Sequence, residues 1–345
     1  MIDRLKNKAL QLIGTFVAEI KAASFKNDDY LDLMQDAPKN RLPNSVLERS
    51  TEGIVKNSAF LSGSVFYLRA KASSIDFTVT YKTRRVLSNM SPIATSGIDL
   101  YKIENKQFQW IGCYGSQDAN SMFYSFSVTN IEKGDLLVIL LPGYATISHL
   151  FVRKSSAKVD DYSDYKGDIL FYGSSITQGC ASTRPGLCYT NLMMLEHNYK
   201  VLNYGFSESA KGEDVIIDYI SSLHSTVFVL EYDHNASVEE LKVTHERAYR
   251  KIRQKNPNAA IILLSRISGG QSITLEEEEV RSQIIQNTYQ TAINEGDKRI
   301  SYIRGRNLVG NNPSLYLKDD RHPNDDGMKL IADAVFLEMC KLGVE

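Results

Sequence analysis

The chain has 345 residues, of which 43% are hydrophobic and 23% are charged, and its formal net charge is −1 at pH 7. This length favours two domains, and this composition is typical of a folded globular protein and excludes a disordered chain. Such a balanced charge gives no electrostatic reason to expect nucleic acid or an anionic membrane as a partner.

Residues 1–40 are expected to form an N-terminal helical segment, because Leu12, Ile13 and Val17 recur at helical spacing. Charged residues such as Lys6 interrupt the stretch, so it has the pattern of neither a secretion signal nor a membrane span, which needs about 18 apolar residues. We interpret it as an amphipathic helix docked on its own chain. Self-association through its apolar face, giving a homo-oligomer, is the alternative. A cytoplasmic location is the matching expectation.

Residues 41–153 have the pattern of an all-β domain. Their β-rich segments partly alternate apolar and polar residues and lie at 64–70, 75–81, 123–128 and 136–141. Turn residues separate these segments at short intervals, as in a β-sandwich. We therefore expect a jelly-roll-like β-sandwich over 41–153 and, because the next residues are polar and charged, a linker over 154–167.

From residue 168 the pattern changes to strand, loop and helix, which defines a second domain over 168–345. Short apolar strands are expected at 169–172, 201–204, 227–232, 260–265 and 300–303. Helices are expected near 186–198, 214–223, 237–255, 274–294 and 326–342. Strands that alternate with helices predict a parallel sheet covered on both faces, which is a three-layer α/β/α domain.

The cysteines are Cys113, Cys180, Cys188 and Cys340, and none forms a CxxC pair. The sequence therefore indicates neither a zinc site nor a dense disulfide framework. Free thiols in a reducing compartment are favoured over a Cys180–Cys188 bridge. We interpret Cys180 as a packing residue, because a cysteine nucleophile would need a base of its own.

A serine follows the first strand of the second domain. The apolar run 169–172 breaks into small polar residues, which places Ser175 at the carboxyl end of a strand, where open α/β sheets hold their active sites. A serine hydroxyl needs a base, and His322 is the best candidate because it follows an acidic pair and precedes Pro323 in a loop. Asp319 could orient its imidazole. Together these residues predict acyl transfer, although His322 alone could equally be a surface or capping histidine.

Two further segments end at the same predicted sheet edge. Gly205 follows the second strand with its backbone N–H, and Asn235 follows the third with a side-chain amide. Acyl transfer creates an oxyanion that needs such donors. A turn glycine and a helix-capping asparagine are the alternative interpretations.

Taken in chain order, four segments resemble the sequence blocks of the SGNH hydrolases, also called GDSL-type esterases. They are 173–179, 203–207, 231–235 and 319–322, and the resemblance covers 165–341. Two positions depart from the family pattern. Ser174 stands where many members carry Asp, and 207–209 reads Ser-Glu-Ser where Ser-Gly-Asn is commoner.

The resemblance implies a flavodoxin-like fold and a role for each matched residue. Ser175 corresponds to the nucleophile, His322 to the base and Asp319 to the carboxylate that orients it. The oxyanion hole then consists of the N–H groups of Ser175 and Gly205 and the amide of Asn235. Family members need no metal or organic cofactor, so we expect neither here.

A narrower resemblance concerns the first domain. The segment 97–101, Gly-Ile-Asp-Leu-Tyr, with Trp110 after it, resembles the motif of a subgroup similar to carbohydrate esterases. These remove acetyl groups from plant-polysaccharide fragments, which implies acetylated xylo- or manno-oligosaccharides as the partner. Gln178, Arg184 and His234 are the candidates for substrate contacts.

Several roles stay open at this point. Arg184 could instead brace its loop, His234 could make a hydrogen bond behind the site, and Trp110 could stack on a sugar or pack in the core. Two other functions also fit the sequence: a lipase or thioesterase with the same triad, or a glycan-binding protein without catalysis.

Overall fold

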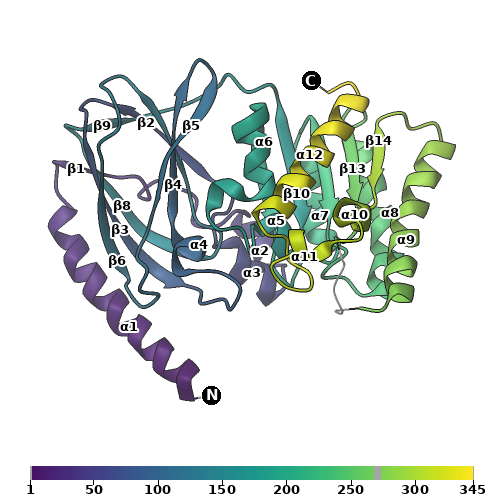
Figure 1. Cartoon of the computed structure of the whole chain (residues 1–345), viewed down its shortest axis with the longest axis horizontal. Helices are drawn as coiled ribbons and strands as arrows, with labels where there is room; N and C mark the ends of the chain where they lie inside the picture. Colours follow the sequence, from purple (N-terminus) through teal and green to yellow (C-terminus); the bar gives the residue numbers. More distant parts are fainter. Residues whose placement is uncertain (1, 268–272, 345) are drawn as a thin grey trace. The chain divides into compact units, whose positions relative to one another are not determined.

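The computed structural model describes residues 2–267 and 273–344, and the chain divides into two compact units (Figure 1). The β unit comprises Met1–Asn40, Ala59–Asp164 and Thr183–Gly186. The α/β unit comprises Arg41–Ser58, Tyr165–Ser182 and Leu187–Glu345. The predicted boundaries differ from these units. Residues 41–58 group with the α/β unit and not with the β-sandwich, whereas 1–40, 154–164 and 183–186 group with the β unit.

Two antiparallel sheets form the β unit. One has four strands, in the order β1 (Tyr30–Asp32), β8 (Ala145–Arg153), β3 (Ile75–Arg84) and β6 (Phe123–Val128). The other has five, in the order β5 (Gln107–Tyr114), β4 (Ile98–Glu104), β7 (Leu136–Leu140), β2 (Val65–Ala70) and β9 (Ala157–Asp160). Both sheets contribute to one apolar core, with Phe77 and Val79 from β3 and Leu100 from β4. The predicted sandwich is confirmed.

The expected linker over 154–167 contains strand β9, which pairs antiparallel with β2 from Tyr67↔Asp160 to Ala70↔Ala157. Arg69 of β2 pairs with Asp160 at 2.7 Å. β9 is an edge strand, and edge strands of native sheets often carry charged side chains. The prediction of a linker is therefore wrong over 157–160, because the polar sequence there belongs to an edge strand.

The N-terminal segment forms helix α1 (Ile2–Ala22), followed by the short η1 (Ala23–Phe25). α1 packs on β3 and buries Ala18, whereas Leu12, Ile13 and Val17 are 65%, 63% and 43% exposed. The helix is confirmed, but Leu12, Ile13 and Val17, on which the prediction of a docked apolar face rested, point largely to solvent. Among the described residues, no helix has the length and apolarity needed to span a bilayer. Self-association through α1 stays a prediction.

A five-stranded parallel sheet forms the centre of the α/β unit. Its order is β11 (Lys200–Gly205), β10 (Asp168–Gly173), β12 (Val227–Glu231), β13 (Ala260–Leu264) and β14 (Ile300–Ile303). Numbered within the unit, this order is the flavodoxin-like 2-1-3-4-5. The predicted strands and the three-layer α/β/α class are confirmed. β12 and β13 are buried throughout, which explains why their sequences are apolar apart from Glu231 at the end of β12.

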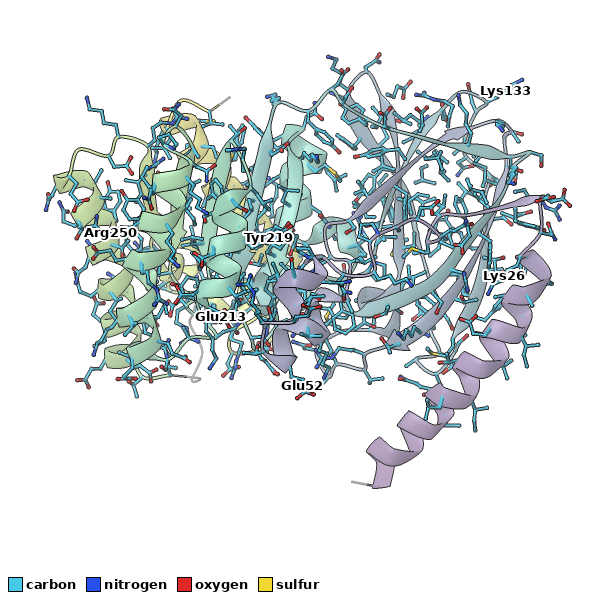
Figure 2. All side chains as sticks on the ribbon, turned by 180° about the vertical axis from the view of Figure 1, so that it is seen from behind. Lys26, Glu52, Lys133, Glu213, Tyr219 and Arg250 are labelled. Atoms are coloured by element: carbon cyan, nitrogen blue, oxygen red, sulfur yellow. The ribbon has the colours of Figure 1, made fainter. Side chains whose placement is uncertain are left out.

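Helices cover both faces of this sheet. On one face α6 (Tyr189–His197) packs against α12 (Asp325–Lys341). On the other, α7 (Asp214–Ser222), α8 (Val238–Lys255) and α9 (Leu275–Asn294) form a row, which Figure 2 shows from behind with Tyr219 on α7 and Arg250 on α8. The short helices of the unit are α2 (Asn44–Leu47), α3 (Glu52–Ser58), α5 (Ser175–Gln178), α10 (Gly305–Val309) and α11 (Pro313–Tyr316). The β unit contains α4 (Pro92–Ser96), and η2 is Pro185–Leu187.

The parallel arrangement brings the carboxyl ends of β11, β10 and β12 to one edge of the sheet. Gly173 at the end of β10 pairs with Gly205 of β11 on one side and with Glu231 of β12 on the other. Ser175 and Asn235 lie in the segments that follow β10 and β12, and Gly205 ends β11, so the fold itself places these three residues at one edge.

Candidate active site

The turn after β10 presents Ser175 at the start of α5. The hydroxyl of Ser174 accepts a hydrogen bond from the backbone N–H of Ile176 and so caps this helix. Gly179 ends it with a φ of 102°, a left-handed conformation that a side chain would strain. The carbonyl of Ser175 accepts from the N–H groups of Gly179 and Cys180 at 3.0 and 2.8 Å. The tight turn therefore fixes the backbone of Ser175.

The structure brings Ser175, His322 and Asp319 together. The hydroxyl of Ser175 lies 2.9 Å from Nε2 of His322, although the two residues are 147 positions apart. Nδ1 of the same ring lies 2.9 and 3.1 Å from the two carboxylate oxygens of Asp319. This is the chain of contacts that a base-activated serine requires.

The loop that carries His322 is closed by its own backbone. Leu317 and Pro323 form an antiparallel bridge, and the N–H of Lys318 donates to the carbonyl of His322 at 2.8 Å. Asn324 then caps α12 by accepting from the N–H of Gly327 at 2.9 Å. This bridge and the start of α12 thus fix the backbone on both sides of His322.

Two pKa shifts follow from this geometry. Burial raises the pKa of Asp319, but the backbone N–H groups of His322 and Arg321 and the imidazole outweigh burial and lower that pKa to about 2. Asp319 therefore stays ionised and can accept from Nδ1–H. Burial lowers the pKa of His322, but the Cys180 side chain and Asp319 together raise it to about 9. Cys180 is buried, in line with its interpretation as a packing residue, but its side chain also interacts with His322, which that interpretation did not include.

We expect Cys180→Ala to lower the pKa of His322, because one of the groups that raises it is removed. Only the neutral imidazole can accept the serine proton, so kcat/KM rises as pH increases through this pKa. In the variant this rise should move to lower pH, while Cys340→Ala should leave it in place. The measurement is kcat/KM for p-nitrophenyl acetate between about pH 6 and 10. A rise at the same or a higher pH in Cys180→Ala would contradict the expected effect.

Gly205 does not offer its N–H to an oxyanion as expected. That N–H donates to the side-chain oxygen of Asn203 at 2.9 Å. A Cβ at Gly205 would lie 2.3 Å from the backbone nitrogen of Gln178, so the glycine is needed for the close approach of β11 and α5. This geometry favours a structural role for the glycine, at the end of strand β11 and not in the turn that the alternative interpretation named. Asn235 donates one amide hydrogen to the carbonyl of Phe206 at 3.0 Å, which holds its side chain at the loop after β11.

This loop contains a strained residue. Glu208 has a φ of 60°, in the left-handed region that costs a non-glycine residue about 1–2 kcal/mol. The N–H groups of Ser209 and Ala210 both donate to the carbonyl of Phe206, which closes the turn around it. The departure from Ser-Gly-Asn therefore keeps a glycine-like backbone at Glu208, and strain of this kind concentrates at functional sites.

Gln178 and His234 were predicted to contact substrate, and the structure gives each of them another partner. Gln178 is fully buried and accepts from the N–H of Ser207 at 2.8 Å, so it braces the loop after β11 and does not contact substrate as expected. Nδ1 of His234 lies 3.3 Å from a guanidinium nitrogen of Arg266. Burial first, and then the charges of Arg266 and His322, lower the pKa of His234 well below its usual value. His234 is therefore neutral, in line with the alternative of a contact behind the site.

Arg184 belongs to the β unit, where Asp99 holds it. Its guanidinium lies 2.6 Å from Asp99, contacts the hydroxyl of Tyr101, and stacks 4.6 Å from the ring of Trp110. Asp99 also accepts from the indole N–H of Trp110 at 2.7 Å and from the N–H of Gly186 at 2.8 Å. The motif at 97–101 thus anchors the loop 183–186, and the loop-bracing alternative for Arg184 is favoured. Trp110 is 55% exposed and is not a core residue.

Sequence reasoning missed Arg41. Its guanidinium donates to the carbonyls of Asn203 at 2.8 Å, Asn57 at 2.9 Å and Gly205 at 2.6 Å, and it lies 4.8 Å from the ring of Phe206. The side chain of Asn57 donates to the carbonyl of Ser207 at 2.9 Å. Residues 41–58 therefore support the loop after β11. No sequence signal pointed to this, because the partners are 162 and 164 positions away.

We expect Arg41→Ala to lower the free energy of unfolding by about 2–4 kcal/mol, because carbonyls that it satisfies lose their donor. Turnover of esters should fall as well, since the loop after β11 loses its support. Arg49→Ala is the matched control, because Arg49 lies in the same segment and its exposed side chain makes a local bond to Ser45. Urea unfolding monitored by circular dichroism provides the measurement. Equal stability of the two variants would refute the supporting role.

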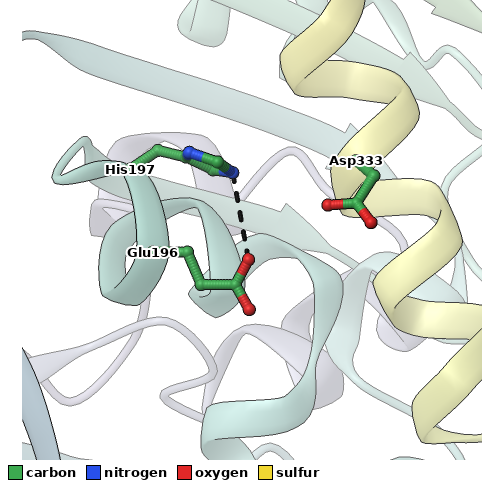
Figure 3. Close-up of side chains that lie close together, drawn as sticks. All are labelled: Glu196, His197 and Asp333. Carbon is green, nitrogen blue, oxygen red and sulfur yellow. Dashed lines mark ion pairs between the residues drawn. The ribbon is translucent and has the colours of Figure 1, made fainter.

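One cluster has the composition of a metal site. The possible ligand atoms of Glu196, His197 and Asp333 all lie within 4.8 Å of one another (Figure 3). The ammonium group of Lys329, however, lies 3.0 Å from Glu196 and also pairs with Asp333. The imidazole of His197 stacks on Phe336 with ring centroids 3.6 Å apart. The ammonium group of the protein already pairs with both carboxylates, so the cluster supports no metal assignment.

Two family models match the two parts of this sequence. A model described as GDSL-like Lipase/Acylhydrolase family matches residues 166–339, and one described as the N-terminus of Esterase_SGNH_hydro-type matches residues 27–157. Among curated proteins, no sequence matches this chain.

Three solved structures show how widely the fold is shared. A Bacteroides ovatus protein named for its likeness to GDSL lipases has a TM-score of 0.80 at 19% identity, over 91% of this chain and 97% of its own. The salicylyl-acyltransferase SsfX3 of a tetracycline biosynthetic pathway has a TM-score of 0.72 at 18% identity, over 92% of each chain. The acetyl xylan esterase Est2A of the rumen bacterium Butyrivibrio proteoclasticus has a TM-score of 0.52 at 12% identity, over 92% of this chain and 100% of its own. With the family model spanning half of the sequence, this chain belongs to the GDSL-like lipase/acylhydrolase family and carries the N-terminal domain of SGNH-type esterases.

Proposed function

We propose that this protein is a serine carboxylester hydrolase that removes O-acetyl groups from carbohydrates, with acetylated xylo- or manno-oligosaccharides as the substrate class. The observation that carries the proposal is the 2.9 Å contact between the hydroxyl of Ser175 and Nε2 of His322. An ionised Asp319 on the opposite ring nitrogen supports the same assignment.

In the proposed mechanism Ser175 attacks the acetyl carbonyl while His322 accepts its proton. The negatively charged Asp319 stabilises the imidazolium that forms and keeps Nε2 directed at the serine. The backbone N–H of Ser175 and the amide of Asn235 are the proposed oxyanion donors. His322 then protonates the leaving sugar oxygen, which departs as a hydroxyl. Water attacks the acetyl-enzyme while His322 accepts its proton, and the return of this proton to the Ser175 oxygen releases acetate.

The substrate class rests on weaker support than the reaction type. Family membership supports ester hydrolysis in general. The name of one structural relative, an acetyl xylan esterase, supports acetyl groups on a sugar. The exposed Trp110 of the β unit offers a surface on which a sugar ring could stack.

Acetate release from a panel of acetylated xylo- and manno-oligosaccharides tests the proposal, with the deacetylated positions identified by NMR. A parallel series of acetyl, butyryl and longer p-nitrophenyl esters tests the acyl group. We expect acetate release and a preference for acetyl. Rates that rise beyond four carbons would favour the lipase or thioesterase alternative. Glycan binding without acetate release would favour the non-catalytic alternative, and transfer of acetyl to a sugar without free acetate would indicate an acyltransferase.

A further inference from the structure

A buried carboxylate lies beneath the nucleophile turn. Glu231 is the last residue of β12, is 2% exposed, and faces Gly173 across the sheet. One of its oxygens, Oε2, accepts from the N–H of Ser174 at 3.1 Å, the hydroxyl of Ser174 at 2.9 Å and the hydroxyl of Thr177 at 2.7 Å. The other, Oε1, lies 3.0 Å from the hydroxyl of Ser174. Glu231 thus holds the residues on both sides of Ser175.

These contacts fix the direction of each hydroxyl proton. Because Ser174 donates to Glu231, its oxygen is free to accept from the N–H of Ile176, the bond that caps α5. Because Thr177 donates to Glu231, the hydroxyl of Tyr189 donates to Thr177 at 2.7 Å. A continuous network therefore runs from the carboxylate through both hydroxyls to the first turn of the helix that presents Ser175.

The backbone is shaped to admit this carboxylate. A Cβ at Gly173 would lie 2.2 Å from Oγ1 of Thr177 and 2.7 Å from Oε2 of Glu231. Only glycine leaves room for the carboxylate to reach the turn.

Burial of the Glu231 carboxylate destabilises the folded protein, and a residue that lowers stability in this way is expected to serve the site. Burial raises the pKa of Glu231 to about 7, although the bonds from Thr177 and Ser174 oppose this shift. The groups that donate to it are hydroxyls and an amide, not cations. Buried acids with perturbed pKa values cluster at functional sites.

We propose that Glu231 is a positioning residue that sets the geometry of the nucleophile through Ser174 and Thr177. This inference rests on the proposed serine mechanism. Glu231 does not touch the reacting atoms; it orients the hydroxyl and backbone N–H of Ser175 for attack and for oxyanion binding. Displacement of a reacting group by 1 Å can cost about 10²-fold in rate, so the effect should fall on kcat and not on KM.

Three variants and a control test the proposal with p-nitrophenyl acetate. Glu231→Ala should lower kcat about 10²-fold with little change in KM. Glu231→Gln should stay within a few-fold of the parent, because its amide oxygen can take the place of Oε2 and its nitrogen can face Ser174. Ser174→Asp with Glu231→Ala should recover at least about 10-fold of the loss, because a carboxylate on residue 174 can cap α5 and reach Thr177. Glu213→Gln removes another carboxylate of the same unit, bonded to Tyr172 at 2.8 Å, and should leave kcat unchanged.

Labelling of Ser175 by a fluorophosphonate normalises each rate to folded, competent enzyme. A parent protein that neither labels nor hydrolyses the ester would refute the proposed function itself. A parent that does both, with an unchanged kcat per labelled site in Glu231→Ala, would refute the positioning role alone. If Glu231→Ala fails to fold, the other two variants decide: loss in Glu231→Gln together with no activity in the double variant overturns the proposal.

Discussion

Replacing Ser175 with alanine is expected to reduce kcat/KM for acetyl esters by about 10⁴-fold or more. The variant loses the only atom that the proposed mechanism joins to the acetyl group. It removes one hydroxyl from a side chain that is 8% exposed, so the fold should persist. Hydrolysis of p-nitrophenyl acetate gives the rate, and circular dichroism with thermal unfolding reports the fold.

Ser182→Ala is the matched control for this variant. Ser182 lies in the same turn region, is buried, and donates its hydroxyl to the carbonyl of Gly179 at 2.8 Å, away from His322. It should retain most of the activity. Full activity in Ser175→Ala would end the assignment of this serine as the nucleophile.

His322→Ala should produce a loss of the same order as Ser175→Ala, and the double variant should lose little more than either single one. The reason is that the hydroxyl and the imidazole, 2.9 Å apart, act as one unit, so removal of either disables both. The residual rate then comes from binding and the oxyanion donors. Steady-state kinetics on the two single variants and the double variant measure this non-additivity.

Asp319→Ala extends the same series. Its loss should be smaller, about 10²- to 10⁴-fold, because the base survives without its orienting carboxylate. Arg321→Ala, which alters an adjacent residue but keeps the backbone N–H that Asp319 accepts, is the control. For the preceding prediction, a double variant of Ser175 and His322 whose loss equals the product of the two single losses would show that the two side chains act independently. This result would contradict the triad.

The parallel sheet was predictable because its strands are buried on both faces. β13 is apolar along its whole length and β12 along all but its last residue, Glu231, so their sequence differs sharply from that of the helices between them. The starts of two helices could also be predicted from the sequence. Ser237 and Glu240 form a capping box at α8, and Thr274 caps α9. These signals act within a few residues and need no knowledge of the fold.

Strand β9 and the segment 41–58 were not predictable in the same way. β9 is polar because it lies at a sheet edge, and its pairing with β2 provides the only reason for it to be extended. Helices α2 and α3 have four and seven residues and are too short to be stable in isolation. They belong with the α/β unit through contacts such as those of Arg41.

The sequence by itself determined which residue types meet at the edge of the sheet. Ser175, Asn235, Asp319 and His322 follow strands or precede a helix, and parallel strands place such positions side by side. What each group does was decided only by the tertiary structure. The N–H of Gly205 is bound by Asn203, the thiol of Cys180 interacts with His322, and the carboxylate of Glu231 lies beneath the nucleophile turn. Hydrogen bonds depend on distances of a few tenths of an ångström between groups far apart in the chain, and periodicity and spacing carry no information at that scale.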